Sequence, residues 1–389
     1  MTMTKNMRDL MGAAAVCWAL GLGAAQAEEG FSAGANGLEF ESGAVRATLG
    51  GRVHLDAASV DDGGTNTDDE EVRRARLELA VRFGDNWRLR VDREFTNGGA
   101  WRNLWLGYAG EDFNIKAGNF IAPFSMEDVG SSNDTMFMER SLVQALAPGF
   151  GVGVGGSYEG RHFSIAGGYF GDAIDVEDNI QAEKGDGVAV RATWSPVERR
   201  SNTFHLGLGL ERREFGNGDV RRISTGPEAS LAPTILSTGS IANPDTSTGY
   251  NLEAAYSVGP VLLQGQFVST ELQRSVGADL GFDGYYAQTG WIITGERHEY
   301  GDATGVFRGP RPRNAWGALE LAARYSSLDL SEAGAPNSGE ADDVTAGVNW
   351  YIGRNFRLAA NYVHSEVDAI NPALDRDVDT VQARAQVDF

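Results

Sequence analysis

Hydrophobic and polar residues alternate along most of this chain from Ala44 onward. The stretch RRARLELAVRF (73–83) places apolar side chains at every second position, namely Ala75, Leu77, Leu79, Val81 and Phe83. Arginine, alanine and glutamate fill the positions between them. Similar runs recur at 204–211 and 344–352, and the chain ends on the run VQARAQVDF. Because successive side chains of a strand point to opposite faces, a period of two predicts β-strands.

Sixteen alternating segments are expected. They lie near 44–58, 71–83, 87–95, 101–109, 113–119, 151–159, 162–170, 187–195, 203–214, 249–257, 261–270, 283–294, 315–326, 342–352, 356–367 and 378–389. Short turns, such as 84–86 and 353–355, alternate with long polar connections, such as 59–70 and 215–248. The connection 295–314 is long where a short one is expected. Short turns at one end and long loops at the other are typical of an up-and-down barrel.

The polar face of these segments decides between a soluble and a membrane fold. A soluble β-sandwich or barrel of sixteen strands needs one large dry core, yet rows of arginines lie opposite the apolar positions. In a bilayer the apolar face meets lipid and the polar face lines a water-filled lumen. We therefore predict an all-β fold: a closed, 16-stranded antiparallel transmembrane β-barrel with short periplasmic turns, long extracellular loops and an inward-folded third loop.

The strand ends and the C-terminus fit a lipid environment. Aromatic residues near strand ends are expected to form interfacial girdles: Phe83, Trp87, Tyr108, Tyr158, Tyr169, Trp194, Trp350 and Phe389. The last strand must pair with the first, because an open edge in lipid leaves backbone groups unsatisfied. A C-terminal phenylalanine on an alternating strand, here Phe389, resembles the signal that the barrel-assembly machinery recognises.

The first 27 residues have the features of an export signal. Lys5 and Arg8 precede the apolar run GAAAVCWALGLGAA, and AQA at 25–27 is a small-x-small cleavage site. The run is short and rich in alanine and glycine for a membrane-spanning helix, which leaves an uncleaved anchor as the alternative. We predict a signal peptide at 1–27, a barrel domain at 28–389 and a location in the bacterial outer membrane.

The chain is acidic overall, but its predicted lumen is basic. The net charge of −21 disfavours nucleic acid as a partner. A row of guanidinium groups in a narrow pore lowers the barrier for anions and suits phosphate and carboxylate. Arginine ladders also brace barrel walls, so a non-selective pore is the alternative. The alternation assigns ten basic residues to one contiguous wall of the lumen: Arg46, Arg52, Arg74, Arg76, Arg82, Arg88, Arg90, Lys116, Arg357 and Arg384.

The connection 120–150 differs from the other loops because it is moderately apolar. Its methionines and phenylalanines would be costly at a cell surface. We hypothesise that this loop folds into the barrel and narrows it. Its position would bring six polar residues near the lumen: Glu127, Asp128, Asn133, Asp134, Glu139 and Arg140.

Catalytic and metal-binding chemistry has little support in the sequence. The histidines are scattered without an HExxH pattern, and Cys17, the only cysteine, lies in the predicted signal peptide. We expect no enzyme activity, no catalytic residue, no metal site and no cofactor. The acidic run DDGGTNTDDEE (61–71) supplies oxygen ligands that suit Ca²⁺, but it lacks EF-hand spacing. A surface-structural or adhesive barrel with acidic cation-binding loops is therefore a second class of function.

Several stretches resemble the phosphate-selective porin O and P family. They are GNFIAPFSMEDVGSSNDTMFMER (118–140), AGGYFGD (166–172), YYAQTGWIITGERHEY (285–300), FRGPRPRNAWGALELAARYSSLDL (307–330), GVNWYIGRNFRLAANYVHSEV (347–367) and the terminal RAQVDF. The resemblance implies a passive outer-membrane porin surrounded by outer-membrane lipid, a homotrimer, an inward third loop and an arginine-lined pore for small anions. It also implies constriction lysines in phosphate-specific members, at least one of them in the third loop. The loop 120–150 contains no lysine, so a weakly selective general diffusion porin stays open as an alternative.

Overall fold

The computed structural model describes residues 30–34, 37–174, 185–199 and 202–389, and the predicted signal peptide at 1–27 lies outside these ranges. Strands dominate the described residues. The helical elements are short: α2 (Met126–Val129), η1 (Leu142–Leu146), η2 (Ser331–Ala333) and η3 (Pro372–Leu374). Within the described ranges no helix is long and apolar enough to cross a membrane.

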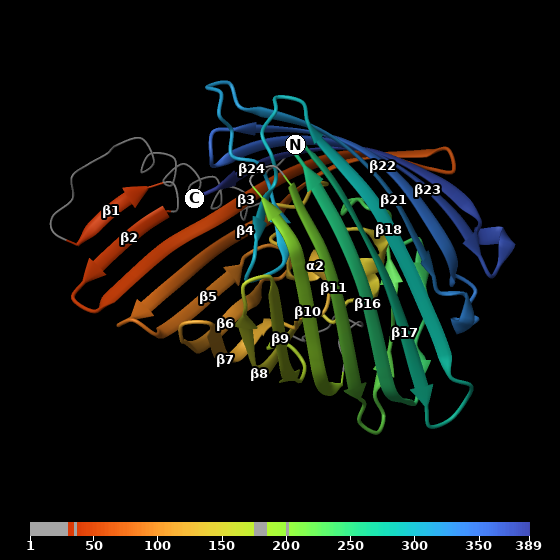
Figure 1. Cartoon of the computed structure of the whole chain (residues 1–389). Coiled ribbons are helices and arrows are strands. Elements are labelled where there is room, and N and C mark those ends of the chain that lie inside the picture. Colours follow the sequence, from red (N-terminus) through yellow and green to blue (C-terminus); the bar gives the residue numbers. More distant parts are fainter. Residues whose placement is uncertain (1–29, 35–36, 175–184, 200–201) are drawn as a thin grey trace.

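Sixteen strands form a closed antiparallel barrel (Figure 1). Each strand pairs with the next barrel strand along the chain, and the last pairs with the first, from Val378 opposite Asp62 to Asp388 opposite Arg52. Every predicted segment coincides with one of these strands, so the predicted fold is confirmed. The barrel strands are β3 (Val45–Asp62), β4 (Thr65–Phe83), β5 (Trp87–Glu94), β6 (Ala100–Ala109), β7 (Phe113–Ile121), β8 (Phe150–Glu159), β9 (Phe163–Phe170), β10 (Asp186–Arg199), β11 (Asn202–Glu214), β16 (Pro244–Val258), β17 (Val261–Arg274), β18 (Leu280–Ile292), β21 (Ala318–Asp329), β22 (Gly339–Ile352), β23 (Phe356–Ala369) and β24 (Arg376–Asp388).

The two faces of the barrel differ as the alternation predicts. Outward side chains are apolar and open to the surroundings; Leu55, for example, is 50% exposed. Inward neighbours such as His54 and Asn251 are fully buried. Near the strand ends the outer face carries exposed aromatic rings, and Trp87 packs edge-on against Tyr108 with ring centres 5.6 Å apart. This distribution is the one expected for a barrel with lipid outside and polar groups inside.

The wall of the barrel is not of even height. Strands β5 to β9 contain 8 to 10 residues, whereas the barrel strands from β10 onward contain 12 to 15 residues. Strands β3 and β4 are the longest, with 18 and 19 residues. The prediction of a long loop at 59–70 was therefore wrong. These residues continue the two strands to a tight turn at Gly63 and Gly64, both of which have positive φ.

A hairpin that the sequence did not predict precedes the barrel. It consists of β1 (Phe31–Gly34) and β2 (Gly37–Ser42), and β2 pairs with the start of β3, from Leu38 opposite Leu49 to Ser42 opposite Val45. The β24 partners of β3 begin only at Arg52. The same edge of β3 is thus covered by β2 along its first residues and by β24 along the rest. Figure 1 shows this hairpin beside the barrel, outside the ring of strands.

Three connections fold into the interior of the barrel. We call them the third loop (122–149), the fifth loop (215–243) and the inner turn (293–317). The fifth loop contains two small strand pairs, β12 (Val220–Arg221) with β15 (Ile241–Ala242) and β13 (Ser224–Thr225) with β14 (Leu236–Ser237). The inner turn contains one, β19 (Glu299–Gly301) with β20 (Val306–Arg308). The inward position of the third loop was predicted, whereas that of the other two segments was missed.

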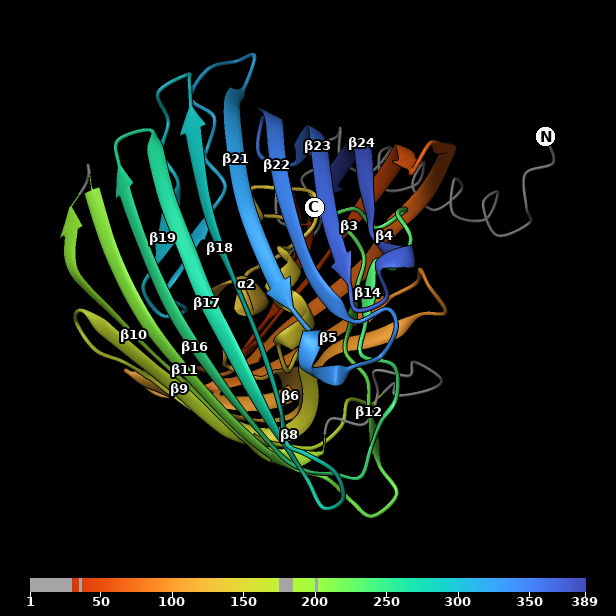
Figure 2. The same ribbon diagram turned by 90° about the vertical axis from the view of Figure 1, so that its right-hand side faces the viewer.

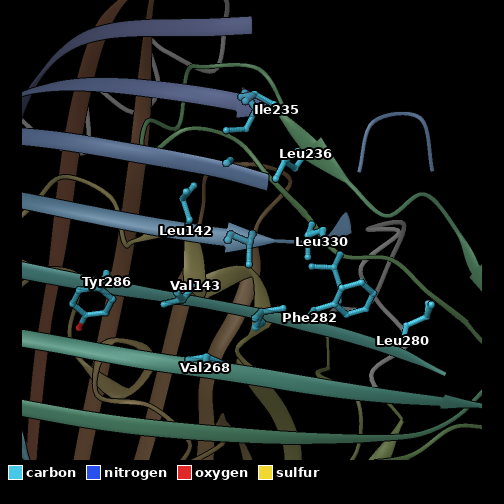
Figure 3. Close-up of a cluster of buried hydrophobic side chains, with 14 of the residues drawn as sticks. Leu142, Val143, Ile235, Leu236, Val268, Leu280, Phe282, Tyr286 and Leu330 are labelled. Atoms are coloured by element: carbon cyan, nitrogen blue, oxygen red, sulfur yellow. The ribbon is translucent and has the colours of Figure 1, made fainter. Parts of the chain in front are cut away.

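Apolar side chains from two of these segments form a core against the inner wall. Figure 3 shows Leu142 and Val143 of the third loop, Leu236 of the fifth loop, and Phe282 and Tyr286 of β18 in this cluster. Each of these five side chains is at most 3% exposed. A second cluster joins Met126 and Met136 of the third loop to Val306 and Phe307 of the inner turn. Burial of this apolar surface stabilises the inward positions of all three segments.

Candidate functional site

The third loop crosses the lumen and is bonded to the opposite wall. Figures 1 and 2 both show its helix α2 inside the ring of strands. Asn251 of β16 donates to the carbonyl oxygen of Phe124 at 3.0 Å, and Asn349 of β22 donates to that of Met136 at 2.8 Å. The amide of Met138 donates to Asn361 of β23 at 2.8 Å. These wall asparagines satisfy backbone groups of the loop that have no secondary-structure partner.

Three of the predicted wall arginines bind this loop. Arg357 donates to the carbonyl oxygen atoms of Thr135 at 2.7 Å and Met136 at 3.1 Å. Arg384 pairs with Asp56 at 2.6 Å and with Glu139 at 2.7 Å. Arg52 donates to the hydroxyl groups of the loop serines at 131 and 132. A guanidinium group offers five donors in a fixed fork, which suits this bracing of a backbone.

Other wall arginines are neutralised by inward carboxylates. Arg90 pairs with Glu78 at 2.6 Å and with Asp92 at 2.5 Å, and Glu78 also pairs with Arg52. Arg76 pairs with Glu94 at 3.1 Å. These pairs cancel part of the positive field that the arginine count alone suggests.

Three predicted wall residues lie away from the middle of the lumen. Arg46 lies beside the β1–β2 hairpin and pairs with Glu41 at 2.9 Å. Arg88 donates to backbone carbonyls of its own turn, including that of Trp87 at 3.0 Å. Arg82 is exposed near the end of β4. Strict alternation indicates the face of a residue but not how far along the barrel it lies from the third loop.

The remaining predicted cations face partners without negative charge. Arg74 is 8% exposed, and no hydrogen bond to its Nε is present among the described residues. Arg140 donates to the carbonyl oxygens of Glu127 at 2.8 Å and Gly130 at 2.9 Å. Lys116 lies over the ring of Phe120, with its Nζ 4.3 Å from the ring centre. Within the described ranges, none of Arg74, Arg140 and Lys116 takes part in an ion pair.

The predicted acids of the third loop are bonded within the loop or to its supports. Glu127 accepts from Ser141 at 2.5 Å, and Asp128 accepts from Gln144 at 2.9 Å. Burial raises the pKa of Glu127, although Arg324 and Ser141 oppose the effect. The side chain of Asn133 lies 3.2 Å from His54. These contacts make the third loop a rigid inner structure.

Two further third-loop acids bond to groups from other elements. Asp134 accepts from the amide of Gly309 in the inner turn at 3.3 Å, and burial raises its pKa. Glu139 accepts from Arg73 at 2.9 Å. Burial opposes ionisation of Glu139, but Arg73 and Arg384 together hold its pKa well below the usual value.

Arg73 is a site residue that alternation missed. A strict period of two places Arg73 on the lipid face, next to Arg74 on the lumen face. The pairing of β3 and β4 shifts at His54 and Leu55, where a β-bulge takes up the extra residue. A bulge redirects side chains, so Arg73 can form a bidentate ion pair with Glu139 of the third loop. The adjacent arginines at 73 and 74 were the available signal, because one of them would otherwise face lipid.

The predicted basic wall did not include arginines of the later strands. Arg191 of β10, Arg213 of β11 and Arg324 of β21 are each at most 4% exposed. Arg324 pairs with Glu228 of the fifth loop and lies 3.5 Å from Glu127. The carboxylate partners of Arg191 and Arg324 lie far away in the sequence, so no local pattern indicates these contacts, whereas Arg213 pairs with Glu211 of its own strand.

The comparisons with known proteins agree with this geometry. Residues 47–389 match the model of the family described as phosphate-selective porin O and P. Porin O of Pseudomonas aeruginosa is 25% identical over 88% of this chain and 88% of its own length. Among solved structures, the anion-selective porin from Comamonas acidovorans has a TM-score of 0.58 at 15% identity, covering 89% of this chain and all of its own.

A second solved structure has the same fold. OmpT of Vibrio cholerae in its trimer form has a TM-score of 0.56 at 14% identity and covers 89% of this chain and all of its own. The family match spans nearly the whole barrel, and the structure is a closed sixteen-stranded barrel with an apolar outer face. The chain therefore belongs to the phosphate-selective porin O and P family, and it is a bacterial outer-membrane porin.

Proposed function

We propose that this porin favours small anions through a group of cations that form no ion pair among the described residues. The observation that carries the proposal is that Arg74, Arg140 and Lys116 have no ion-pair partner among the described residues. Arg140 donates to carbonyl groups, Lys116 lies over an aromatic ring, and the Nε of Arg74 has no hydrogen-bond partner there. The positive charges of Arg73, Arg76 and Arg140 act on Arg74, and the carboxylates of Glu139 and Glu94 oppose them. A fixed excess of positive charge in a low-dielectric pore lowers the barrier for anions.

The solute is a small anion rather than a defined nutrient. Anion-selective and phosphate-selective relatives support the class of solute. The third loop has no lysine, and the pairs Arg90–Glu78 and Arg76–Glu94 reduce the net charge of the wall. These features favour moderate selectivity over tight phosphate binding. The competing function is a general diffusion pore. In such a pore the arginines only shape the electric field across the lumen and do not select between ions.

The first test is the reversal potential of the purified porin in a planar bilayer under a KCl gradient. We expect an anion-selective potential for the wild type and a several-fold lower chloride-to-potassium permeability ratio for Arg74→Gln. The matched control is Arg212→Gln, because Arg212 is exposed on the outer face of β11. A wild-type potential near zero would contradict the proposal, and phosphate block of the chloride current would show how strongly phosphate itself binds.

We also propose that the porin is a homotrimer whose subunits meet at the outer face of β5 to β9. These strands of 8 to 10 residues barely reach the roughly 9–11 residues that a tilted strand needs to span the bilayer. Arg93 lies on this face opposite the exposed Leu77, and it stacks on Trp101 at 5.0 Å. An arginine facing lipid costs about 2–4 kcal/mol at the bilayer midplane, and a partner subunit removes that contact. OmpT, which has a similar fold, is known in a trimer form.

The trimer is tested by gel migration of unheated protein in mild detergent. Arg93→Glu is expected to shift the porin from trimer to monomer, because it reverses the charge of a residue within the proposed interface. Arg212→Glu, with the same change of charge on a different outer face, should remain trimeric. A wild-type monomer, or an Arg93→Glu variant that stays fully trimeric, would argue against this interface.

A further inference from the structure

One buried carboxylate of the barrel wall is bonded directly to the third loop and, through two other wall side chains, to the inner turn. Glu253 lies on β16, and its side chain is fully buried. We propose that Glu253 is a positioning residue that fixes the third loop relative to the inner turn and thereby sets the cross-section of the channel. The inference goes beyond the proposed anion preference, because its readouts are the conductance and the current noise of the channel.

The first set of contacts joins Glu253 to the start of the third-loop helix. The amide of Met126, the first residue of α2, donates to its Oε2 at 2.7 Å. Asn251 donates to the same oxygen at 3.1 Å and to the carbonyl oxygen of Phe124 at 3.0 Å. Ser125 caps the helix by accepting from the amide of Asp128. The entry of the third loop is therefore held to β16 by one carboxylate oxygen and its neighbour.

The second set of contacts joins Glu253 to the inner turn through two wall side chains. Arg191 donates from Nε to Glu253 Oε1 at 2.8 Å, and its other nitrogens donate to the carbonyl oxygens of Thr304 at 2.5 Å and Gly305 at 2.9 Å. His205 Nε2 lies 3.3 Å from Glu253, and His205 Nδ1 lies 2.7 Å from the hydroxyl of Tyr300. The charge of Glu253 thus fixes the orientation of the two side chains that bind the inner turn.

The two inward segments also touch each other beyond this point. The amide of Gly309 donates to Asp134, and Met126 packs in one apolar cluster with Val306 and Phe307. A shift of the inner turn therefore displaces the third loop. Because Glu253 lies at the wall end of both attachments, it is the group whose change affects both segments at once.

The chemistry requires a carboxylate at this position. Its two oxygens accept from Met126, Asn251 and Arg191, and His205 lies within reach, so nearly all lone-pair sites are used. Glutamine keeps the size but turns one acceptor into a donor that faces other donors. Removal of one partner from a buried charged pair leaves the remaining charge unpaired, which is strongly unfavourable. The segments are then expected to leave their positions.

The experiment compares single-channel currents of the full-length porin with those of Glu253→Gln. We expect roughly a twofold rise in mean conductance and added current noise, because conductance follows the narrowest section of a pore. The matched control is Glu211→Gln on the neighbouring strand β11, since Glu211 is also an inward carboxylate and pairs with Arg213 of its own strand. Heat-dependent gel migration checks that each variant forms a barrel.

A second variant keeps the inference testable if Glu253→Gln does not fold. Arg191→Lys keeps the positive charge but loses the fork that reaches Thr304 and Gly305, so added noise with a smaller rise in conductance is expected. Wild-type conductance and noise in a folded Glu253→Gln variant, or in Arg191→Lys, would overturn the inference. A wild-type channel without anion preference would overturn the proposed function alone, because the change in conductance would still be observed.

Discussion

At the scale of single residues, the basic side chains of the lumen fall into two groups. Arg357 and Arg384 use their donors to brace the third loop, whereas Arg74 and Lys116 lack an ion-pair partner within the described ranges. The alternation of the sequence predicted the face of each residue, because a strand fixes it. The partner of each residue depends on contacts between distant segments, and these follow no local pattern. Arg73 shows most clearly where prediction from alternation fails, because one β-bulge moves its side chain from the predicted lipid face to the lumen face.

The pair of Arg73 and Glu139 predicts how the third loop responds to acid. The pKa of Glu139 lies below its usual value of 4.5, so the stabilisation is complete above about pH 4.5 and is lost as the pH falls through the lower pKa of the folded protein. Glu127 and Asp134 act in the opposite direction, because burial raises their pKa values. We expect single-channel noise to stay constant from pH 7 to pH 5 and to rise only at lower pH.

The Glu139→Gln variant separates this effect from general acid damage. It removes one partner of a pair in which Arg73 remains a fifth exposed, so a cost of roughly 2 kcal/mol to the loop position is expected. The variant should be noisy already at pH 7 and should change little between pH 5 and pH 4. A variant that keeps the quiet wild-type current at pH 7 would show that the ion pairs of Glu139 with Arg73 and Arg384 do not hold the loop in place.

At the scale of elements, the strands and the inward third loop were predictable, whereas the inward positions of the fifth loop and the inner turn were not. Each barrel strand has a buried and an exposed face, so polar and apolar residues alternate in its sequence with a period of two. The hairpin end of β3 and β4 escaped prediction because its residues are aspartate and glutamate, which are poor strand formers. The fifth loop and the inner turn have no regular period. Their inward position depends on single contacts, such as that of Glu228 with Arg324 and Ser326.

The whole molecule depends on the closure between β3 and β24. Phe389 exchanges two backbone hydrogen bonds with Gly51, at 2.8 and 3.0 Å. A Cβ atom at Gly51 would lie 2.9 Å from the ring of Phe389 and 2.5 Å from the carbonyl oxygen of Arg76. Glycine is therefore required where the last aromatic ring lies against the first barrel strand.

We expect Gly51→Val to lower the temperature at which the barrel unfolds, because overpacking at this site costs about 1–3 kcal/mol. Heat-dependent gel migration measures this temperature. The matched control is Gly34→Val in β1, where an added Cβ meets no atom within 4 Å. If the Gly51→Val barrel melted together with the wild type, the close approach of Phe389 would have no bearing on stability.

The divided edge of β3 also bears on the order in which the barrel forms. Its lower residues pair with β2, which directly precedes it, and its upper residues pair with β24, which is the last strand of the chain. Contacts between neighbours in sequence form early, whereas contacts between the two chain ends carry a large loop-closure entropy and form late. The part of this edge from Val45 to Leu49 is therefore already paired before the final strand arrives. Until then, only the segment from Arg52 to Asp62 is open to incorrect pairing with other chains.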